Sequence, residues 1–419
     1  MKMDNNELLS DRGKSTQMSI KALTGVKVLE YASFVAAPYC AKLLADLGAE
    51  VIKIEKPVVG DEARRCGPFP EDVPNSERSG LFLYLNTNKL GITLNLETYT
   101  GYEIFKGLVN GADILIEDNR PEVMKESGLD YQSLVAINPK LIMTSITPFG
   151  QSGPYSNYKA YYLNAYQSCM LGYLTPVGSS RPERSPLKIG GFVGEYACGL
   201  SAAVATLGAL YSQRSCGKGQ YIDISKQEAL LGFGRVNAAY YANEGKEHPR
   251  IFRLMGKGGV MPCKDGHLCI HAPEDYQWDA LVQLMGSPDW ATDEKYRTPL
   301  GRMMHWHEIM PLIKNWTSTR IKEEVYHPAQ QLGCTVTPVT TTADIVNSKQ
   351  SKARGFFSEI SHPEAGRFKY PTSPLIFSET PVKIERPAPM LGEHNEEVYI
   401  KRLGYTQEDI VQMAKAGII

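Results

Sequence analysis

The residue with the clearest capacity for covalent chemistry is Glu195, a carboxylate in a glycine-rich stretch. Four glycines lie between positions 190 and 199, and an Ala-rich apolar run follows from 200 to 210. Glycine has no Cβ, so such a backbone can approach a bulky ligand closely and adopt positive φ. The apolar run has helical composition, which places Glu195 in a turn leading into a helix, where backbone N–H groups stabilise negative charge. Acidic residues are common at helix starts, and the local sequence alone favours that simpler interpretation.

Other groups of reactive residues form weaker patterns. The glycine loop Gly256-Lys257-Gly258-Gly259 could close over a reactive intermediate, but it lacks the spacing and strand–helix context of a phosphate-binding loop. His267 and His271 alternate onto one face of an expected strand without a third ligand at a suitable spacing, so we expect no metal site. The sequence also contains no G-x-S-x-G nucleophile elbow.

Two further clusters each allow two interpretations. Lys53, Lys56, Arg64 and Arg65 lie in or just after an expected strand, and would either bind a phosphorylated ligand or form a solvated face. Six tyrosines lie in the segment 155–173. They would either form a cage for a cationic head group through cation–π attraction or pack as half-buried core residues. Composition favours the second interpretation of the tyrosines.

The first part of the chain alternates between strands and helices. Strands are expected over 25–30, 49–55, 92–96, 112–117 and 141–146, and helices over 36–47 and 99–109. Repeated strand–helix–strand units indicate a parallel sheet, so we predict an α/β fold with a doubly wound domain. Ligands of such sheets bind beyond the carboxyl ends of the strands, here in the loops after Glu30, Glu55, Glu117 and Ile146.

A second, smaller domain is expected where this alternation weakens, between about Phe233 and Thr335. All four tryptophans and most histidines lie there, and Asp265-Gly266 predicts a hairpin turn. Residues 1–19 are polar and mixed in charge, without the apolar core of a secretory signal. We therefore expect them to form a disordered leader.

Composition argues against several classes of function. The chain has 419 residues and a net charge of -1, which gives no electrostatic footprint for nucleic acid or an anionic membrane. No apolar run approaches the roughly 18 residues of a spanning helix. The eight cysteines contain no C-x-x-C pair, which favours reduced thiols and a cytoplasmic location.

A series of motifs covers nearly the whole chain after residue 20. In order they are Ala22-Leu23-Thr24-Gly25-Val26-Lys27-Val28-Leu29-Glu30, Ala36-Ala37-Pro38, Leu47-Gly48-Ala49-Glu50-Val51-Ile52-Lys53-Ile54-Glu55-Lys56-Pro57, Asn86-Thr87-Asn88-Lys89, Asn138-Pro139-Lys140-Leu141-Ile142, Phe149-Gly150-Gln151-Ser152-Gly153-Pro154, Gly217-Lys218-Gly219-Gln220-Tyr221-Ile222-Asp223-Ile224 and Leu391-Gly392-Glu393-His394-Asn395. In this order and spacing they resemble the family III CoA-transferases, which include formyl-CoA, carnitine and bile-acid CoA-transferases and their racemase relatives.

The resemblance implies a fold, an assembly and a reaction. Residues 20–225 and 336–419 would form a large Rossmann-like domain, residues 226–335 a smaller α+β domain, and two copies would interlock as a homodimer. The substrates would be an acyl-CoA and a small carboxylic acid, with no permanently bound cofactor. CoA would move between the two acids through an acyl-glutamyl anhydride and an enzyme–CoA thioester.

The resemblance also implies roles for individual residues. Glu195 stands where the family has a nucleophilic aspartate, one methylene shorter, and Gly258 and Gly259 belong to the family's flexible glycine loop. The residues expected to line the adenosine and pantetheine path are Ser33, Phe34, Val35 and Ala36. Further CoA contacts are expected from Lys56, Asn88, Lys89, Asp118, Asn119 and Lys159, the last near the thioester.

The same matching bears on the reaction and the acid. The glutamine of the family's oxalate site falls on Val35, which argues against oxalate. The segment Ala160–Leu174 is loosely similar to the carnitine and bile-acid branches, and its tyrosines would suit a trimethylammonium acid. The racemase relatives need a histidine ahead of the carboxylate, but no histidine precedes His248, so a racemase is disfavoured. Glutamate in place of aspartate also leaves open a non-catalytic CoA-binding subunit of a hetero-oligomer.

Overall fold

The structure is a computed structural model that describes residues 20–175, 183–247 and 258–419. The chain forms two compact units: the larger contains residues up to Tyr173, Leu187–Lys246 and Phe356–Ile419, and the smaller contains Leu174–Pro186 and Glu247–Gly355. The C-terminal segment therefore returns to the unit that the first half of the chain builds. The expected leader lies outside the described residues, and the domain limits expected at 225/226 and 335/336 stay predictions.

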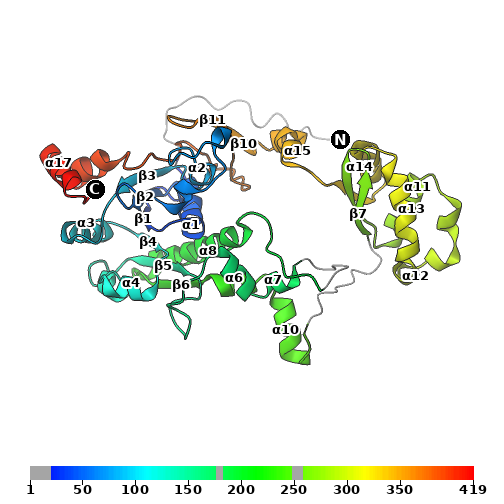
Figure 1. Cartoon of the computed structure of the whole chain (residues 1–419), viewed down its shortest axis with the longest axis horizontal. Coiled ribbons are helices and arrows are strands. Elements are labelled where there is room, and N and C mark those ends of the chain that lie inside the picture. Colours follow the sequence, from blue (N-terminus) through cyan, green and yellow to red (C-terminus); the bar gives the residue numbers. More distant parts are fainter. Residues whose placement is uncertain (1–19, 176–182, 248–257) are drawn as a thin grey trace. The chain divides into compact units, whose positions relative to one another are not determined.

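A parallel six-stranded sheet forms the centre of the larger unit, with the strand order β3-β2-β1-β4-β5-β6 (Figure 1). The strands are β1 (Lys27–Tyr31), β2 (Glu50–Glu55), β3 (Lys89–Thr93), β4 (Ile114–Glu117), β5 (Ile142–Thr147) and β6 (Tyr221–Ser225). Most residues of the central strands are buried, as expected for a sheet that helices cover on both faces. The predicted α/β fold class is confirmed.

Successive residues of one strand supply the cores on opposite faces of the sheet. Val28 packs with residues of α1 (Ala36–Asp46) and α8 (Val193–Cys216), whereas its neighbour Leu29 packs with residues of α3 (Tyr99–Asn110). The core that contains Leu29 also contains Val398 and Tyr399 from a C-terminal π-helical segment, Glu396–Arg402. Alternation between two apolar layers explains why both odd and even positions of the expected strands carry apolar residues.

Shorter elements complete the larger unit. Its remaining helices are α2 (Gly80–Leu85), α4 (Pro121–Glu126), α5 (Tyr131–Val135), α6 (Tyr162–Ser168), α9 (Lys226–Leu231), α10 (Arg235–Glu244) and α17 (Gln407–Lys415), and α7 (Leu171–Leu174) ends at the division between the units. Two 3₁₀ turns cover Glu62–Arg65 and Pro70–Asp72, and β10 (Phe357–His362) pairs antiparallel with β11 (Gly366–Pro371).

One helix departs from an expectation of the sequence. By length and composition α8 is apolar enough to cross a membrane, although no apolar run was expected to reach that length. Half of its most apolar window is buried, and Ala202, Ala203 and Thr206 belong to the side that faces the sheet and α1. A partly buried core helix of this kind is only weak support for a membrane span.

The smaller unit combines an antiparallel sheet with helices. Its strands are β7 (Gly258–Cys263), β8 (Gly266–His271) and β9 (Thr335–Pro338), in the order β7-β8-β9. The hairpin expected at Asp265-Gly266 joins β7 to β8. The helices are α11 (Asp275–Leu284), α12 (Pro299–Met304), α13 (Trp306–Ser318), α14 (Lys322–Gln331), α15 (Thr342–Asn347) and α16 (Lys349–Ala353), with 3₁₀ turns at Asp289–Thr292 and Glu294–Tyr296.

Candidate active site

The strand order indicates that a ligand would bind at the carboxyl ends of the central strands. β1 pairs with β2 on one side and with β4 on the other, so the order in which successive strands are added to the sheet reverses between β1 and β4. The backbone N–H of Ser33, after β1, donates to both carboxylate oxygens of Asp118, after β4, at 3.1 and 3.3 Å. Ligands of open α/β sheets bind at such a switch point, beyond the carboxyl ends of the strands.

Glu195 lies in the first turn of α8, two residues after the helix begins at Val193. It is only 2% exposed, and its Oε2 lies 2.8 Å from Nζ of Lys226, the residue that follows β6 and begins α9. The N–H groups that have no partner within the helix, and the dipole at the start of α8, favour a negative charge here. Two features, a helix start and an ammonium group, therefore favour negative charge at this buried position.

Lys226 keeps its positive charge in spite of its environment. Burial alone would lower the pKa of Lys226, but the ion pair and hydrogen bond with Glu195 and the nearby Asp118 raise it above its usual value. Asp118 behaves differently, because burial raises the pKa of its carboxyl to about 8, against the opposing effect of Lys226. The site thus brings together the Glu195 carboxyl, the Lys226 ammonium and the Asp118 carboxyl with its raised pKa.

Two glycines near Glu195 are required by close packing. A Cβ on Gly199 would lie 2.4 Å from the backbone oxygen of Ala36, so only glycine lets α8 approach the start of α1. A Cβ on Gly194 would lie 2.7 Å from Cε2 of Tyr162, whose hydroxyl accepts a hydrogen bond from the Gly194 N–H at 3.3 Å. The glycine-rich sequence around Glu195 therefore brings the helix start against two neighbouring elements.

The loop after β1 has an unusual conformation that buried charges support. Phe34 has φ +72°, a region that non-glycine residues seldom occupy. Its N–H donates to Oδ1 of Asp61 at 2.9 Å, and the Ser33 hydroxyl donates to the same oxygen at 3.2 Å. Oδ2 of Asp61 pairs with Lys53 at 2.7 Å, and Lys53 also pairs with Glu30 at 2.7 Å. Burial would raise the pKa of Asp61. The Lys53 ammonium and the backbone N–H groups that donate to Asp61 outweigh this effect and hold the pKa below its usual value.

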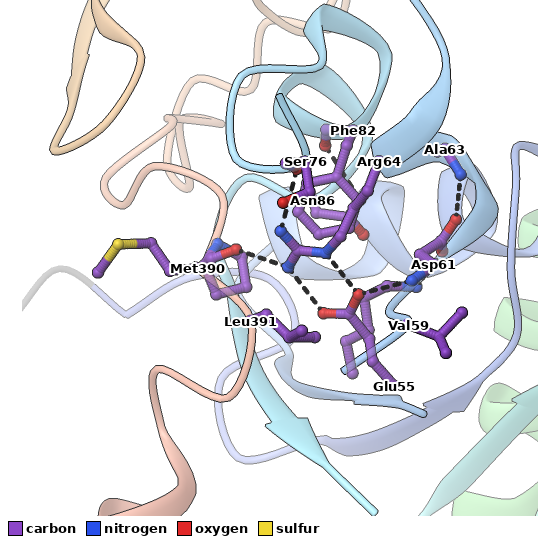
Figure 2. Close-up of polar contacts among 12 residues, drawn as sticks. Glu55, Val59, Asp61, Ala63, Arg64, Ser76, Phe82, Asn86, Met390 and Leu391 are labelled. Carbon is purple, nitrogen blue, oxygen red and sulfur yellow. Dashed lines mark hydrogen bonds and ion pairs between the residues drawn. The ribbon is translucent and has the colours of Figure 1, made fainter. Parts of the chain in front are cut away.

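A second buried ion pair extends this support (Figure 2). Glu55 accepts hydrogen bonds from Nε and an Nη of Arg64 at 2.7 and 2.9 Å, and from the N–H of Asp61 at 2.9 Å. Arg64 also pairs with Glu77 at 2.8 Å and donates to the backbone oxygen of Pro389 at 3.1 Å. Figure 2 shows the guanidinium pointing toward Glu55, with the segment at Met390 on its other side.

Of the four basic residues considered for phosphate binding, Lys53 and Arg64 are therefore committed to internal ion pairs. Lys56 and Arg65 are exposed, and Lys56 pairs with the exposed Glu97 at 2.9 Å. Of the six tyrosines considered as a cage, Tyr162 and Tyr166 are buried and the other four are exposed or half-exposed. The ammonium of Lys188 lies 4.5 Å from the centre of the Tyr162 ring, so this ring already makes a cation–π contact within the chain.

The structure brings together part of the expected CoA site. Ser33, Phe34, Val35 and Ala36 form the loop after β1 and the start of α1, beside Asp118. The N–H of Asn119 donates to Glu117, a carboxyl whose pKa burial raises to about 7. Lys56 lies at the carboxyl end of β2, and Lys159 is exposed in the segment between β5 and α6.

Asn88 and Lys89 lie elsewhere, at the amino end of β3 and so at the opposite edge of the sheet. The Asn88 amide donates to Asp46 at 2.8 Å, and its oxygen accepts from the backbone N–H groups of Glu385 and Arg386. Lys89 is fully buried, and its ammonium pairs with Glu30 at 2.6 Å and donates to Pro38 and Asn86. Both side chains bond within the chain, and their contact with CoA stays a prediction.

The glycine loop is only partly within the described residues. Gly256 and Lys257 lie outside them, and Gly258 and Gly259 begin β7 in the smaller unit. Gly258 has φ +151°, and a Cβ there would lie 2.0 Å from the backbone oxygen of Ile270. Pairing with β8 is therefore enough to require glycine at this position, and a catalytic role of the loop stays a prediction.

Lys226 and Asp61 belong to the site but were not expected from the sequence. Lys226 lies 31 residues beyond Glu195, and only the folding of β6 beside β5 brings the two together. Asp61 follows Gly60 in the turn after β2, where it resembles an ordinary turn residue. A charged residue directly after the last strand of the sheet is the one signal that would have pointed to Lys226.

Comparison with known proteins identifies the family. The model of CoA-transferase family III matches residues 23–395, so the chain belongs to this family and is a CoA-transferase. It is 33% identical to a formyl-CoA:oxalate CoA-transferase of Streptomyces coelicolor, over 96% of this chain and 100% of that protein. It is 32% identical to a succinate–glutarate CoA-transferase of Agrobacterium fabrum, over 90% and 94% of the two chains. A solved CAIB/BAIF family protein from Brucella suis matches with a TM-score of 0.81 and 30% identity, over 91% of this chain and 99% of that one.

Proposed function

We propose that this CoA-transferase moves CoA between an acyl-CoA donor and a carboxylic acid acceptor, with Glu195 as the covalent nucleophile. The observation that carries the proposal is the buried Glu195 carboxylate at the start of α8, 2.8 Å from Lys226. Nucleophilic carboxylates must stay ionised where water is excluded, and a helix start together with an ammonium group provides that condition.

The first half of the reaction transfers CoA to the enzyme. Lys226 holds Oε2 of Glu195, so Oε1 attacks the thioester carbon, the C–S bond breaks, and the CoA thiolate leaves a mixed anhydride. The thiolate then attacks the glutamyl carbonyl carbon of this anhydride. That step forms a glutamyl–CoA thioester and releases the donor acid as its carboxylate.

The second half repeats these steps with the acceptor. The acceptor carboxylate attacks the glutamyl–CoA thioester, the thiolate leaves again, and a new anhydride forms between the acceptor and Glu195. The thiolate attacks the acyl carbon of the acceptor, which yields the new acyl-CoA and restores the Glu195 carboxylate. No net proton is consumed, so the site needs charge stabilisation rather than a general acid.

Lys226 and the backbone serve this stabilisation in the proposed reaction. Each step forms a tetrahedral intermediate with a developing oxyanion, which N–H groups and a nearby ammonium stabilise best in a water-poor site. Lys226 remains charged, and the N–H groups of the first turn of α8 have no partners inside the helix. The additional methylene of glutamate, compared with aspartate, is accommodated by the same ion pair, which fixes where the carboxylate lies.

The CoA moiety would run along the carboxyl edge of the sheet. We propose contacts from Ser33, Phe34, Val35 and Ala36, with further contacts from Lys56, Asp118, Asn119 and Lys159. Contacts from Asn88 and Lys89, which lie at the amino end of β3, stay a prediction. An interlocked homodimer, in which Gly258 and Gly259 contribute to the site, and a cytoplasmic location complete the proposal.

Isotope exchange tests this function without knowledge of the natural substrates. Purified protein is incubated with an acyl-CoA and the matching radiolabelled free acid, and label is followed into the acyl-CoA. We expect exchange that Glu195→Gln abolishes and that Glu228→Gln, at an exposed position in the first turn of α9, leaves unchanged. Exchange that survives Glu195→Gln would contradict the proposed nucleophile.

A further inference from the structure

A cavity of about 750 Å³ lies beside the first turn of α8, within the larger unit. Its walls come from α1, the loop 67–70, α2, the start of α8 and β11. Phe192, three residues before Glu195, and Tyr196, directly after it, both line the cavity. The cavity therefore adjoins the helical turn that carries the proposed nucleophile.

The lining of this cavity is mostly aromatic and aliphatic. The rings of Tyr39 and Tyr196 meet edge to face with centroids 4.9 Å apart, and Tyr84 meets Tyr196 at 6.2 Å. Phe69 and Leu81 contribute further apolar walls. Small-molecule sites are typically of about 300–1,000 Å³ and mostly apolar, and aromatic walls favour a flat ring through edge-to-face packing. Oxalate has no apolar surface to bury and would lose water from both carboxylates here.

The charged residues that line the cavity are positive, and one of them, Arg78, also pairs with the exposed Glu364 at 4.0 Å. Arg78 and Lys369 line it, and no carboxylate is found among its lining residues in the described part of the chain. A trimethylammonium acid would bring a third positive charge to this place, which argues against such a guest. A guest with an acceptor oxygen or a negative group is favoured instead.

Two donors in the wall await a partner. Nε of Arg78 and the hydroxyl oxygen of Tyr370 are both buried, and neither has a hydrogen-bond partner among the described residues. Burial raises the pKa of Tyr370, so its O–H remains available as a donor. Buried donors without acceptors are costly, so a small shift of either side chain toward a ligand oxygen in the cavity would be favourable.

We propose that this cavity receives the acyl part of an aromatic carboxylic acid that carries an additional acceptor oxygen on or near its ring. The inference rests on the proposed function, because it takes the cavity as the acyl side of the Glu195 site. A phenyl ring of the acid packs against Tyr39, Tyr84 and Tyr196, and its oxygen accepts from Tyr370 or Arg78. The acid class thus differs from the dicarboxylic acids named for the relatives of this chain.

The test compares isotope exchange for matched pairs of acid and acyl-CoA. The pairs are 3-(4-hydroxyphenyl)propionate, 3-phenylpropionate, propionate, oxalate and betaine, each with its own CoA thioester. We expect kcat/KM for 3-phenylpropionate to exceed that for propionate by about 10- to 100-fold, the effect of burying one phenyl ring. Phe69→Ala should lower this ratio by about 10-fold, whereas Phe377→Ala, an exposed phenylalanine outside the cavity, should leave it unchanged. Tyr370→Phe should reduce only the further gain from the ring hydroxyl.

The possible outcomes distinguish a failure of the inference about the cavity from a failure of the proposed function. Exchange that depends on Glu195 but prefers propionate, oxalate or betaine overturns the inference and leaves the proposed function standing. If no acid exchanges, the proposed function fails, and the cavity is tested by equilibrium binding of 3-phenylpropionyl-CoA. Binding that Phe69→Ala weakens and Phe377→Ala does not supports the inference about the cavity. Binding that neither variant affects overturns the inference. A crystal structure in which residues of a second copy of this chain fill the cavity would also overturn the inference.

Discussion

Replacing Lys226 with methionine removes the ammonium group that contacts Glu195 and keeps a side chain of similar length. The pair is 2.8 Å long, with the Lys226 and Glu195 side chains 15% and 3% exposed. With an effective dielectric constant of about 20, the attraction at this distance is about 6 kcal/mol. Removing one partner of a buried pair typically costs about 3–5 kcal/mol, because the other charge is left unpaired.

Part of this loss will appear in the rate of exchange, because the ammonium that contacts the carboxylate no longer stabilises the developing oxyanions. If about 3 kcal/mol acts in the transition state, kcat/KM falls by about 100- to 200-fold. The sign follows from the charge, since a cation stabilises the negative charge that develops in each step.

The assay is the initial rate of isotope exchange between an acyl-CoA and its free acid. We expect kcat/KM to fall by about 100- to 200-fold in Lys226→Met. Lys226→Arg keeps a cation at the site and should retain most of the activity, and Lys218→Met, at an exposed position before β6, serves as the matched control. An unchanged kcat/KM in Lys226→Met would refute the electrostatic role given to this lysine.

Further predictions concern the elements that support the site. Gly199→Ala places a Cβ 2.4 Å from the Ala36 oxygen and should lower the free energy of unfolding by about 1–3 kcal/mol. Gly208→Ala, in the same helix with nothing within 4 Å, should raise it by about 0.5–1 kcal/mol; denaturant unfolding that ranks the two variants the other way would contradict the packing of α8 on α1. The folded-state pKa of Asp61 lies below its usual value, so its stabilising contribution is complete above about pH 4 and is lost as pH falls through the lowered pKa. Asp61→Asn should therefore lower the thermal midpoint of unfolding at pH 7, and the midpoint of this variant should fall less steeply toward acid pH. A midpoint equal to that of the wild type at pH 7 would show that the ion pair of Lys53 with Asp61 does not stabilise the fold.

The parallel sheet could be predicted because short stretches of sequence are enough to recognise its strands. Strands buried on both faces must be apolar almost throughout, and the runs around Val28 and Ile116 have that character. The first and last residues of β3 were harder to predict. The predicted strand began at residue 92, whereas β3 begins at Lys89, directly after Asn88 with φ +65°. A left-handed asparagine in a turn leaves little mark on the hydrophobic pattern.

Asn88 and Lys89 were expected to contact CoA because they belong to a recognisable motif. The motif does not say at which end of its strand the residues lie, and here they lie at the amino end of β3. Glu195 could be singled out from its glycines, whereas its partner Lys226 could not, because their contact depends on the order of strands in the sheet. Sequence patterns thus indicate candidate groups, and the topology decides which of them meet.

The most direct test of the account is to trap the covalent intermediate on Glu195. The protein is incubated with an acyl-CoA, treated with hydroxylamine, which converts a glutamyl thioester or anhydride into a stable hydroxamate, and digested for peptide mapping by mass spectrometry. The account predicts a hydroxamate at Glu195 that forms only in the presence of acyl-CoA. An enzyme that exchanges CoA between acids while Glu195 remains unmodified, or that carries the hydroxamate on another carboxylate, would contradict it.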